Sequence, residues 1–382
     1  MLDWETIEKG KKPLGRYGPW VWAVEFVRGC NFKCWHCSAR VFPSDGVHRY
    51  MSRETWESMF KIAAECTPNG RLELGQCGEP TLHPELYEML ELGRKTSPTT
   101  QQLIHTNGSN VLSGKVSLGK MFDAGLNTVV FDVYSKKDWF VDLAKKSGAE
   151  WYLYDDHKIG SPNHRNAWSY ANDPDMKLVV IRDCPEKRMR WRKFGRMSTF
   201  LNHIDWKVAM PKGLVPVRES YERKCTIPMR FSTVDYEGNY LFCCIDFLCE
   251  SGGLLGNVKD GPEGFKRYWF GELMQSIRKR LHNKDRSGIP YCSQCNCAFS
   301  KCDWTGMWPE GSYDGWWDGE KWNKIIDDSE VFADGWKKKE AKESLLPTKS
   351  EEQEVLEKSS DIIVPSTIVA QRDRNRKGFG LK

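Results

Sequence analysis

Three cysteines stand close together in the stretch "VRGCNFKCWHC", which runs from residue 27 to residue 37. Cys30, Cys34 and Cys37 have the spacing C-x3-C-x2-C, without a fourth local cysteine. Thiolates are the usual ligands of a [4Fe–4S] cluster, so three of them hold three irons and leave the fourth iron open to another ligand. Zinc is the alternative, because a structural zinc site needs four ligands and His36 could supply the fourth.

The later cysteines form a second pattern. Cys225 is followed after twelve residues by Gly238 and, four residues further on, by Cys243. "CSQC" then supplies Cys292 and Cys295. A glycine at this place suits a hairpin turn between the first two thiols. These residues predict a second metal site, and a zinc knot remains an alternative because it uses the same C-x2-C element.

The composition predicts a cytoplasmic protein that binds metal. The chain has 382 residues, of which 40% are hydrophobic and fourteen are cysteines. Its first residues lack the apolar region of a secretory signal, and no apolar run reaches the ~18 residues of a membrane span. In a reducing compartment, clustered cysteines bind metal or do chemistry more often than they form disulfides. The net charge of +5 permits an anionic partner without requiring one.

Strand and helix patterns alternate over the first half of the chain. A buried strand is expected at residues 20–27, directly before the first cysteine loop, and a helix from Ser52, its N-cap, through Ala64. Further strands are expected at 71–76, 101–108, 126–135, 150–156 and 177–183, and further helices at 83–96, 114–125 and 136–149. Such alternation predicts an α/β fold with a parallel sheet, a partial (β/α)6 TIM-like barrel. Chemistry in such folds gathers on the loops after the strands, where the first cysteine loop lies.

The alternation stops at about residue 210, and the composition changes there. The predicted organisation is a leader at 1–20, a core at 21–210, a cysteine-rich α+β unit at 211–305, a Trp- and Gly-rich segment at 306–336 and a charged flexible tail at 337–382. A weak hairpin signal lies in "VDYEGNYLF" within the cysteine-rich unit.

The first cysteine motif, after the first strand of a βα series, resembles the signature of the radical S-adenosylmethionine (SAM) superfamily. The resemblance implies that SAM binds the open iron. SAM is then cleaved reductively to a 5′-deoxyadenosyl radical, which takes hydrogen from a substrate. "GQCGEPTLHPEL" resembles the family's Gly-Gly-Glu-Pro stretch, with Cys77 in place of the first glycine. This implies that Gly78, Glu79 and Pro80 contact SAM through their backbone.

Three further residues are candidate SAM contacts by the same resemblance. "HTNG" matches a Thr-Asn-Gly stretch at the end of the third strand, which points to Asn107. Asp132 stands where the family has a polar residue that contacts SAM, and His36 occupies the position beside the adenine. Taken singly, such loop residues are more often solvated or form caps.

The second cysteine pattern resembles the SPASM/Twitch extension of radical SAM enzymes. The resemblance implies one auxiliary [4Fe–4S] cluster, the Twitch form, held by Cys225, Cys243, Cys292 and Cys295. The cysteines without an assigned role include Cys77, Cys244, Cys249, Cys297 and Cys302.

The resemblance implies a radical SAM enzyme, an oxidoreductase or isomerase. Its expected substrate carries an amino-acid-like group and is a peptide side chain, or a small molecule or nucleobase decorated with an amino acid. Its expected electron donor is a reductase, a flavodoxin or a ferredoxin. One alternative is hypermodification of a nucleobase, which the Trp-rich segment could stack. The other is a metal-stapled binding protein without catalysis.

Overall fold

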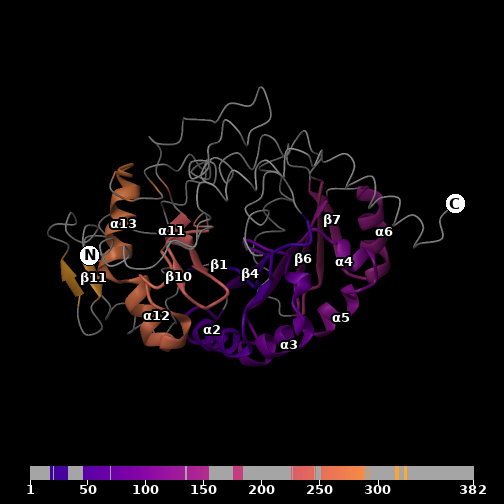
Figure 1. Ribbon diagram of the computed structural model, residues 1–382, viewed down its shortest axis with the longest axis horizontal. Helices are drawn as coiled ribbons and strands as arrows, with labels where there is room; N and C mark the ends of the chain where they lie inside the picture. Colours follow the sequence, from indigo (N-terminus) through magenta and orange to yellow (C-terminus); the bar gives the residue numbers. More distant parts are fainter. Residues whose placement is uncertain are drawn as a thin grey trace, which may run out of the picture.

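A computed structural model gives the arrangement of the chain (Figure 1). The structure describes residues 18–19, 21–32, 46–68, 70–133, 136–154, 175–183, 225, 227–244, 246, 251–287, 289, 292, 315–317 and 322–324. The expectations for residues 1–17 and for the tail at 337–382 lie outside these ranges.

The central feature is an eight-stranded sheet with the order β10-β9-β1-β4-β5-β6-β8-β7. Its strands are β1 (Val21–Val24), β4 (Arg71–Leu74), β5 (Gln101–Thr106), β6 (Thr128–Val133), β7 (Glu150–Tyr154), β8 (Leu178–Asp183), β9 (Phe231–Val234) and β10 (Tyr240–Leu241). All neighbouring strands are parallel except β9 and β10, which are antiparallel. The predicted α/β class and partial TIM-like barrel are confirmed.

The last two barrel strands do not follow chain order. β8 lies between β6 and β7, and it pairs in parallel with both. The chain therefore passes from β6 through α6 (Lys137–Ser147) to the edge of the sheet, and later returns to fill the place beside β6.

The hairpin in the cysteine-rich region belongs to the same sheet. β9 pairs with β1 in parallel, with Val21 opposite Phe231 and Val24 opposite Val234. Gly238 lies between the two hairpin strands at φ +90°, a conformation that glycine adopts without steric cost. The hairpin expected from the sequence is confirmed, and it extends the barrel sheet instead of forming a separate one.

Helices cover one face of this sheet, as Figure 1 shows for α2, α3, α5, α6 and α12. Their bounds are α2 (Arg53–Cys66), α3 (Leu86–Thr96), α5 (Leu118–Asp123) and α12 (Gly261–Trp269). Ser52 caps α2 as expected by accepting the backbone N–H of Thr55, and α2 runs two residues past Ala64. The remaining elements are β2 (Val27–Arg28), β3 (Arg49–Tyr50), η3 (Pro80–Leu82), α4 (Ser109–Leu112), α11 (Ile227–Arg230), η5 (Val258–Asp260), α13 (Glu272–His282), β11 (Gly315–Trp317) and β12 (Trp322–Lys324).

Alternation along the strands gives the sheet two different faces. One face packs in a large core with the helices, and its strand residues are Trp22, Val24, Leu72, Leu74, Ile104, Val129, Phe131, Val179 and Ile181. The opposite face, here called the inner face, carries Val21, Ala23, Arg71, Glu73, Leu103, His105, Val130, Asp132, Val180 and Arg182. The inner face therefore combines a small apolar cluster with charged side chains.

Within the described ranges, no helix combines the length and the apolar character needed to cross a membrane.

Candidate functional site

Of the three N-terminal cysteines, the structure describes Cys30, which follows β2 at the end of the sheet where β1 also ends. Cys34, Cys37 and the adenine candidate His36 lie outside the described residues. Parallel strands bring their carboxyl ends to one edge of a sheet, and the loops after β4 and β5 meet the Cys30 loop at that edge.

The loop after β4 touches the backbone of the Cys30 loop. The backbone N–H of Glu79 donates to the carbonyl of Gly29 at 2.9 Å. A Cβ on Gly78 would lie 1.8 Å from the carbonyl oxygen of Val27, so only glycine allows this approach. Pro80 is buried at the start of η3. Gly78 and Glu79, two of the three residues predicted to contact SAM, thus lie directly against the first cysteine loop.

The carboxylate of Glu79 points away from solvent and holds two loops together. One oxygen accepts the backbone N–H and hydroxyl of Thr81 at 3.1 and 2.5 Å and the hydroxyl of Thr106 at 2.6 Å. The other oxygen accepts the backbone N–H of Asn107 at 2.8 Å. Burial raises the pKa of the Glu79 carboxyl, and these four hydrogen bonds oppose that shift. Sequence reasoning assigned Glu79 a backbone role and missed the role of its side chain.

Asn107 lies beside Cys30. Its side-chain Nδ2 is 3.7 Å from Cys30 Sγ and 2.9 Å from the Asn31 side-chain oxygen. Cys30 Sγ also accepts the backbone N–H of Phe32 at 3.3 Å. The predicted cofactor residue Asn107 and the predicted cluster ligand Cys30 are therefore brought together.

Asp132 occupies the inner face one strand further along. Its carboxylate forms a short ion pair with Arg182, which stands opposite it on β8. The structure thus gives the predicted SAM contact Asp132 a charged partner that the sequence pattern did not indicate.

A second charged group on the inner face was also missed by sequence reasoning. Glu73 forms an ion pair with Arg71, and its other carboxylate oxygen lies 3.6 Å from His105 Nε2. Burial alone would raise the pKa of the Glu73 carboxyl, but Arg71 and His105 outweigh it and bring the pKa down to about 2. The alternating charged residues of "RLEL" and the histidine before Thr-Asn-Gly were the only sequence signals for this group.

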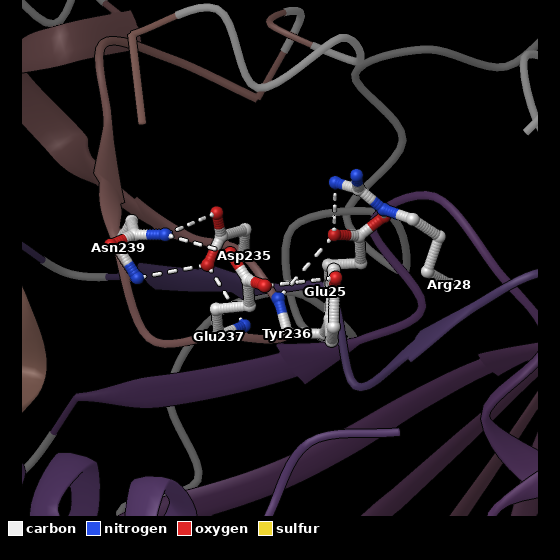
Figure 2. A network of polar contacts seen from close by, with 6 residues as sticks. All are labelled: Glu25, Arg28, Asp235, Tyr236, Glu237 and Asn239. Carbon is white, nitrogen blue, oxygen red and sulfur yellow. Dashed lines mark hydrogen bonds and ion pairs between the residues drawn. The ribbon is translucent and has the colours of Figure 1, made fainter. Parts of the chain in front are cut away.

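A polar network joins the start of the Cys30 loop to the turn of the β9–β10 hairpin (Figure 2). Glu25 pairs with Arg28 at 2.7 Å and accepts the backbone N–H of Tyr236 at 3.4 Å. The Arg28 guanidinium lies 4.9 Å from the centroid of the Tyr236 ring. Asp235 closes the hairpin turn by accepting the backbone N–H groups of Glu237 and Asn239.

The described cysteines of the second pattern lie on the elements around this hairpin. Cys225 donates its backbone N–H to Leu281 of α13 at 3.3 Å, and Cys225 and Cys292 both pack against the large core. Cys243 follows β10, and Cys295 lies outside the described residues. No group of three or more potential metal ligands is assembled in the described part of the chain. The gathering of the four thiols therefore stays a prediction.

The loop after β4 also contacts the second cysteine region. Gln76, in the loop after β4, donates from its Nε2 to the backbone carbonyl of Cys244, the residue after Cys243. The backbone N–H groups of Gly75 and Gln76 share the carbonyl of Val24 at 3.2 Å. Cys244 itself is buried, as expected for a cysteine with no ligand role, and Cys249, Cys297 and Cys302 lie outside the described residues.

Comparison with protein families matches the two parts of the chain to two family models. Residues 24–146 match the radical SAM superfamily, and residues 225–296 match the SPASM iron–sulfur cluster-binding domain. Residues 24–146 are therefore a radical SAM domain. The C-terminal cysteine region is a SPASM domain, as the second motif predicted. No curated protein matches this radical SAM chain.

Comparison with solved structures finds similar chains. BtrN in complex with AdoMet and 2-DOIA is 19% identical, with a TM-score of 0.50 and coverage of 73% of this chain and 93% of BtrN. Native anSMEcpe with bound AdoMet is 17% identical, with a TM-score of 0.39 and coverage of 76% and 88%. SuiB of Streptococcus suis bound to S-adenosylmethionine is 13% identical, with a TM-score of 0.37 and coverage of 72% and 73%.

A radical SAM domain uses SAM and a [4Fe–4S] cluster, and a SPASM domain binds auxiliary iron–sulfur clusters. The described residues at the first site fit these groups. Cys30 is a soft sulfur ligand with two N–H groups directed at it. The loop after β4 lies so close to the Cys30 loop that a Cβ at Gly78 would not fit.

Proposed function

We propose that this protein is a radical SAM enzyme that oxidises or rearranges a substrate carrying an amino-acid-like group, and that it works in the cytoplasm. Cys30, Cys34 and Cys37 would hold the first cluster, which would pass one electron to SAM for its cleavage to a 5′-deoxyadenosyl radical that takes hydrogen from the substrate. The chain contributes the backbone of Gly78, Glu79 and Pro80 as the SAM contact. A reductase, a flavodoxin or a ferredoxin supplies the electron.

The observation that carries this proposal is the hydrogen bond between Glu79 N–H and the Gly29 carbonyl, with no room for a Cβ at Gly78. It brings the motif that would bind SAM against the loop that would bind the cluster. The two motifs thereby lie at one site, although Cys30 and Glu79 are 49 residues apart in the sequence. A structural zinc site would give no reason for this contact, since it needs only its own four ligands.

The inner face supports the proposed substrate class. It carries two carboxylate–guanidinium pairs, Glu73–Arg71 and Asp132–Arg182, which a substrate with both charges could exchange for its own groups. Carboxylates bind ammonium groups, and guanidinium groups bind carboxylates in paired hydrogen bonds. An amino-acid-like group carries both an ammonium and a carboxylate, so these side chains complement it.

SAM cleavage tests the first part of the proposal without knowledge of the substrate. The enzyme is purified anaerobically, reduced with dithionite and assayed for 5′-deoxyadenosine. Wild type should contain iron and sulfide and should form this product. Cys30→Ala, Cys34→Ala and Cys37→Ala should each abolish it, because the cluster needs all three thiolates.

Cys66→Ala is the matched control. Cys66 is buried in α2, and burial raises the pKa of its thiol to about 12, so it is an inert core residue. This variant should retain SAM cleavage. Zinc without iron in the wild-type protein, or 5′-deoxyadenosine from a triple variant of the first three cysteines, would contradict the proposal and favour a metal-stapled binding protein.

Iron content tests the auxiliary cluster. With both [4Fe–4S] sites full, the chain should hold about eight irons. Replacing Cys225, Cys243, Cys292 and Cys295 together by Ala should halve this value and spare SAM cleavage. Zinc at these four positions in protein never exposed to air would exclude an iron–sulfur cluster there.

A further inference from the structure

The side-chain amide of Asn107 has a fixed orientation. Its Oδ1 accepts the backbone N–H of Ser109 at 2.9 Å. Its Nδ2 donates to Asn31 Oδ1 at 2.9 Å, and Asn31 Nδ2 in turn donates to the hydroxyl of Ser109 at 2.8 Å. Because a backbone N–H is always a donor, this closed cycle determines which atom of the Asn107 amide is oxygen and which is nitrogen.

The cycle leaves one hydrogen of Asn107 Nδ2 for Cys30. An amide nitrogen carries two hydrogens, and Asn31 Oδ1 takes one of them. Among the residues that the structure describes, Nδ2 also donates to Cys30 Sγ at 3.7 Å. As a thiol, Cys30 can itself donate to Asn31 Oδ1 at 3.8 Å, but a thiolate bound to iron only accepts hydrogen bonds.

The backbone of Asn107 is held as firmly as its side chain. Its N–H donates to the buried carboxylate of Glu79, and Thr106 donates to the same carboxylate. The loop that delivers the amide to Cys30 is therefore tied to the loop that would bind SAM. Because the backbone and the side chain of Asn107 are both held, its amide keeps its direction toward Cys30 Sγ and needs no conformational ordering.

We propose that Asn107 is a positioning residue that raises the reduction potential of the first [4Fe–4S] cluster by donating a hydrogen bond to the thiolate of Cys30. This inference rests on the proposed function, in which Cys30 ligates that cluster. A hydrogen bond to a ligand sulfur draws negative charge away from the cluster and stabilises the reduced form, which carries one more electron. The backbone N–H of Phe32 adds a second bond to the same sulfur.

A redox titration followed by electron paramagnetic resonance tests the proposal. The signal of the first cluster is recognised by its change when SAM is added, since SAM binds that cluster's open iron. Asn107→Ala removes the donor. Asn107→Asp keeps the oxygen that accepts from Ser109 and replaces the donor by an acceptor. Asn110→Ala is the matched control, because Asn110 lies three residues further on in α4 and its amide binds Thr81.

Both Asn107 variants should make the reduction potential of the first cluster more negative. We expect a shift in the reduction equilibrium of about tenfold, which is 59 mV for a one-electron couple. Asn110→Ala should keep the wild-type potential. Wild-type potentials in both Asn107 variants would overturn the proposal. Loss of iron from both, with iron retained in Asn110→Ala, would also overturn it and give Asn107 a role in assembly alone. A wild-type protein without an iron–sulfur cluster would instead overturn the proposed function.

Discussion

The carboxylate of Glu79 accepts the backbone N–H of Asn107 at 2.8 Å and so joins the loops that follow β4 and β5. Its second oxygen accepts three hydrogen bonds from Thr81 and Thr106. A single buried carboxylate thus sets the position of the loop after β4, here called the SAM-motif loop, relative to Asn107, which contacts Cys30. Such a group is costly to leave unpaired, so both loops are held to it.

Glu79→Gln should break one bond of this set. The amide oxygen of Gln can replace the oxygen that serves Thr81 and Thr106, but its NH2 group would then face the N–H of Asn107. We expect the free energy of unfolding to fall by about 1–3 kcal/mol, the cost of a buried unpaired polar group. Anaerobic denaturant unfolding measures this. Glu85→Gln, at the exposed start of α3, should change it little. Equal stability of the two variants would show that the Glu79–Asn107 bond contributes nothing.

Gly78→Ala should separate the SAM-motif loop from the cysteine loop. The new Cβ would lie 1.8 Å from the carbonyl oxygen of Val27 and 2.7 Å from that of Gly29, so the backbones must move apart. A displacement of about 1 Å at a reacting site costs on the order of a hundredfold in rate, and we expect SAM cleavage to fall by that order.

Gly119→Ala is the control for this substitution. Gly119 lies in α5, and a Cβ there would meet only the Ser117 hydroxyl oxygen at 3.9 Å. Alanine also favours a helix over glycine. This variant should cleave SAM at the wild-type rate. A Gly78→Ala enzyme as active as Gly119→Ala would mean that the two loops separate before SAM binds.

Local elements of the barrel could be predicted well from the sequence, because their signals are local. The helix after Ser52 has a capping serine and a periodic apolar face, and the structure shows both. The hairpin turn at Gly238 was also predictable, because its backbone needs a positive φ. The cysteine spacings, together with their place after the first strand and the stretch "GQCGEPTLHPEL", were specific enough to indicate both families.

Long-range pairing was not predictable in this way. The exchange of β7 and β8 depends on which strand edges pair, and alternation of strands and helices leaves that open. The partner of β9 is β1, from which it is separated by most of the barrel sequence, and no local pattern indicates it. Asp132 was expected within a strand as a SAM contact, and its ion pair with Arg182 follows only from the register of β6 and β8. The contact between Asn107 and Cys30 likewise arises only when two loops meet at one sheet edge.

Asp235 should make the stability of the hairpin junction depend on pH (Figure 2). Burial raises the pKa of the Asp235 carboxyl to about 6, from an ordinary value of 3.8. The nearby charge of Glu25 adds to the increase, while the Asn239 hydrogen bonds and Arg28 oppose it. Because the folded state holds the proton more tightly, protonated Asp235 adds to the free energy of unfolding. This stabilisation is complete below about pH 4 and is lost as pH rises through about 6.

The measurement compares wild type with Asp235→Asn, which cannot ionise. Between about pH 5.5 and pH 7.5, wild type should lose on the order of 1 kcal/mol of unfolding free energy relative to the variant. Glu237→Gln is the control, because Glu237 is the adjacent acid in the same turn. Its difference from wild type should stay constant over this range. A constant difference for Asp235→Asn as well would show that Asp235 does not titrate there.

Gln76 should determine how firmly the auxiliary cluster is held. Its Nε2 donates to the carbonyl of Cys244, so it fixes the chain beside the predicted ligand Cys243 from the SAM-motif loop. Gln76→Ala removes this bond. Gln76→Glu places a negatively charged acceptor against a carbonyl oxygen and should repel it. Both changes should loosen the loop that carries Cys243, and Gln76→Glu should do so more strongly.

Iron release to a chelator under anaerobic conditions measures this effect. In protein with both clusters, we expect iron to leave the auxiliary site several-fold faster in Gln76→Ala than in wild type. It should leave faster still in Gln76→Glu. The rate for the first cluster should stay unchanged, because the Gln76 side chain bonds to Cys244 and its backbone N–H, which binds Val24, is kept in both variants. Iron release should show two kinetic phases, one for each cluster. The variant that lacks Cys225, Cys243, Cys292 and Cys295 assigns them, because it should show the first-cluster phase alone. Equal acceleration of both phases would mean that Gln76 stabilises the whole sheet edge and does not act on the auxiliary site.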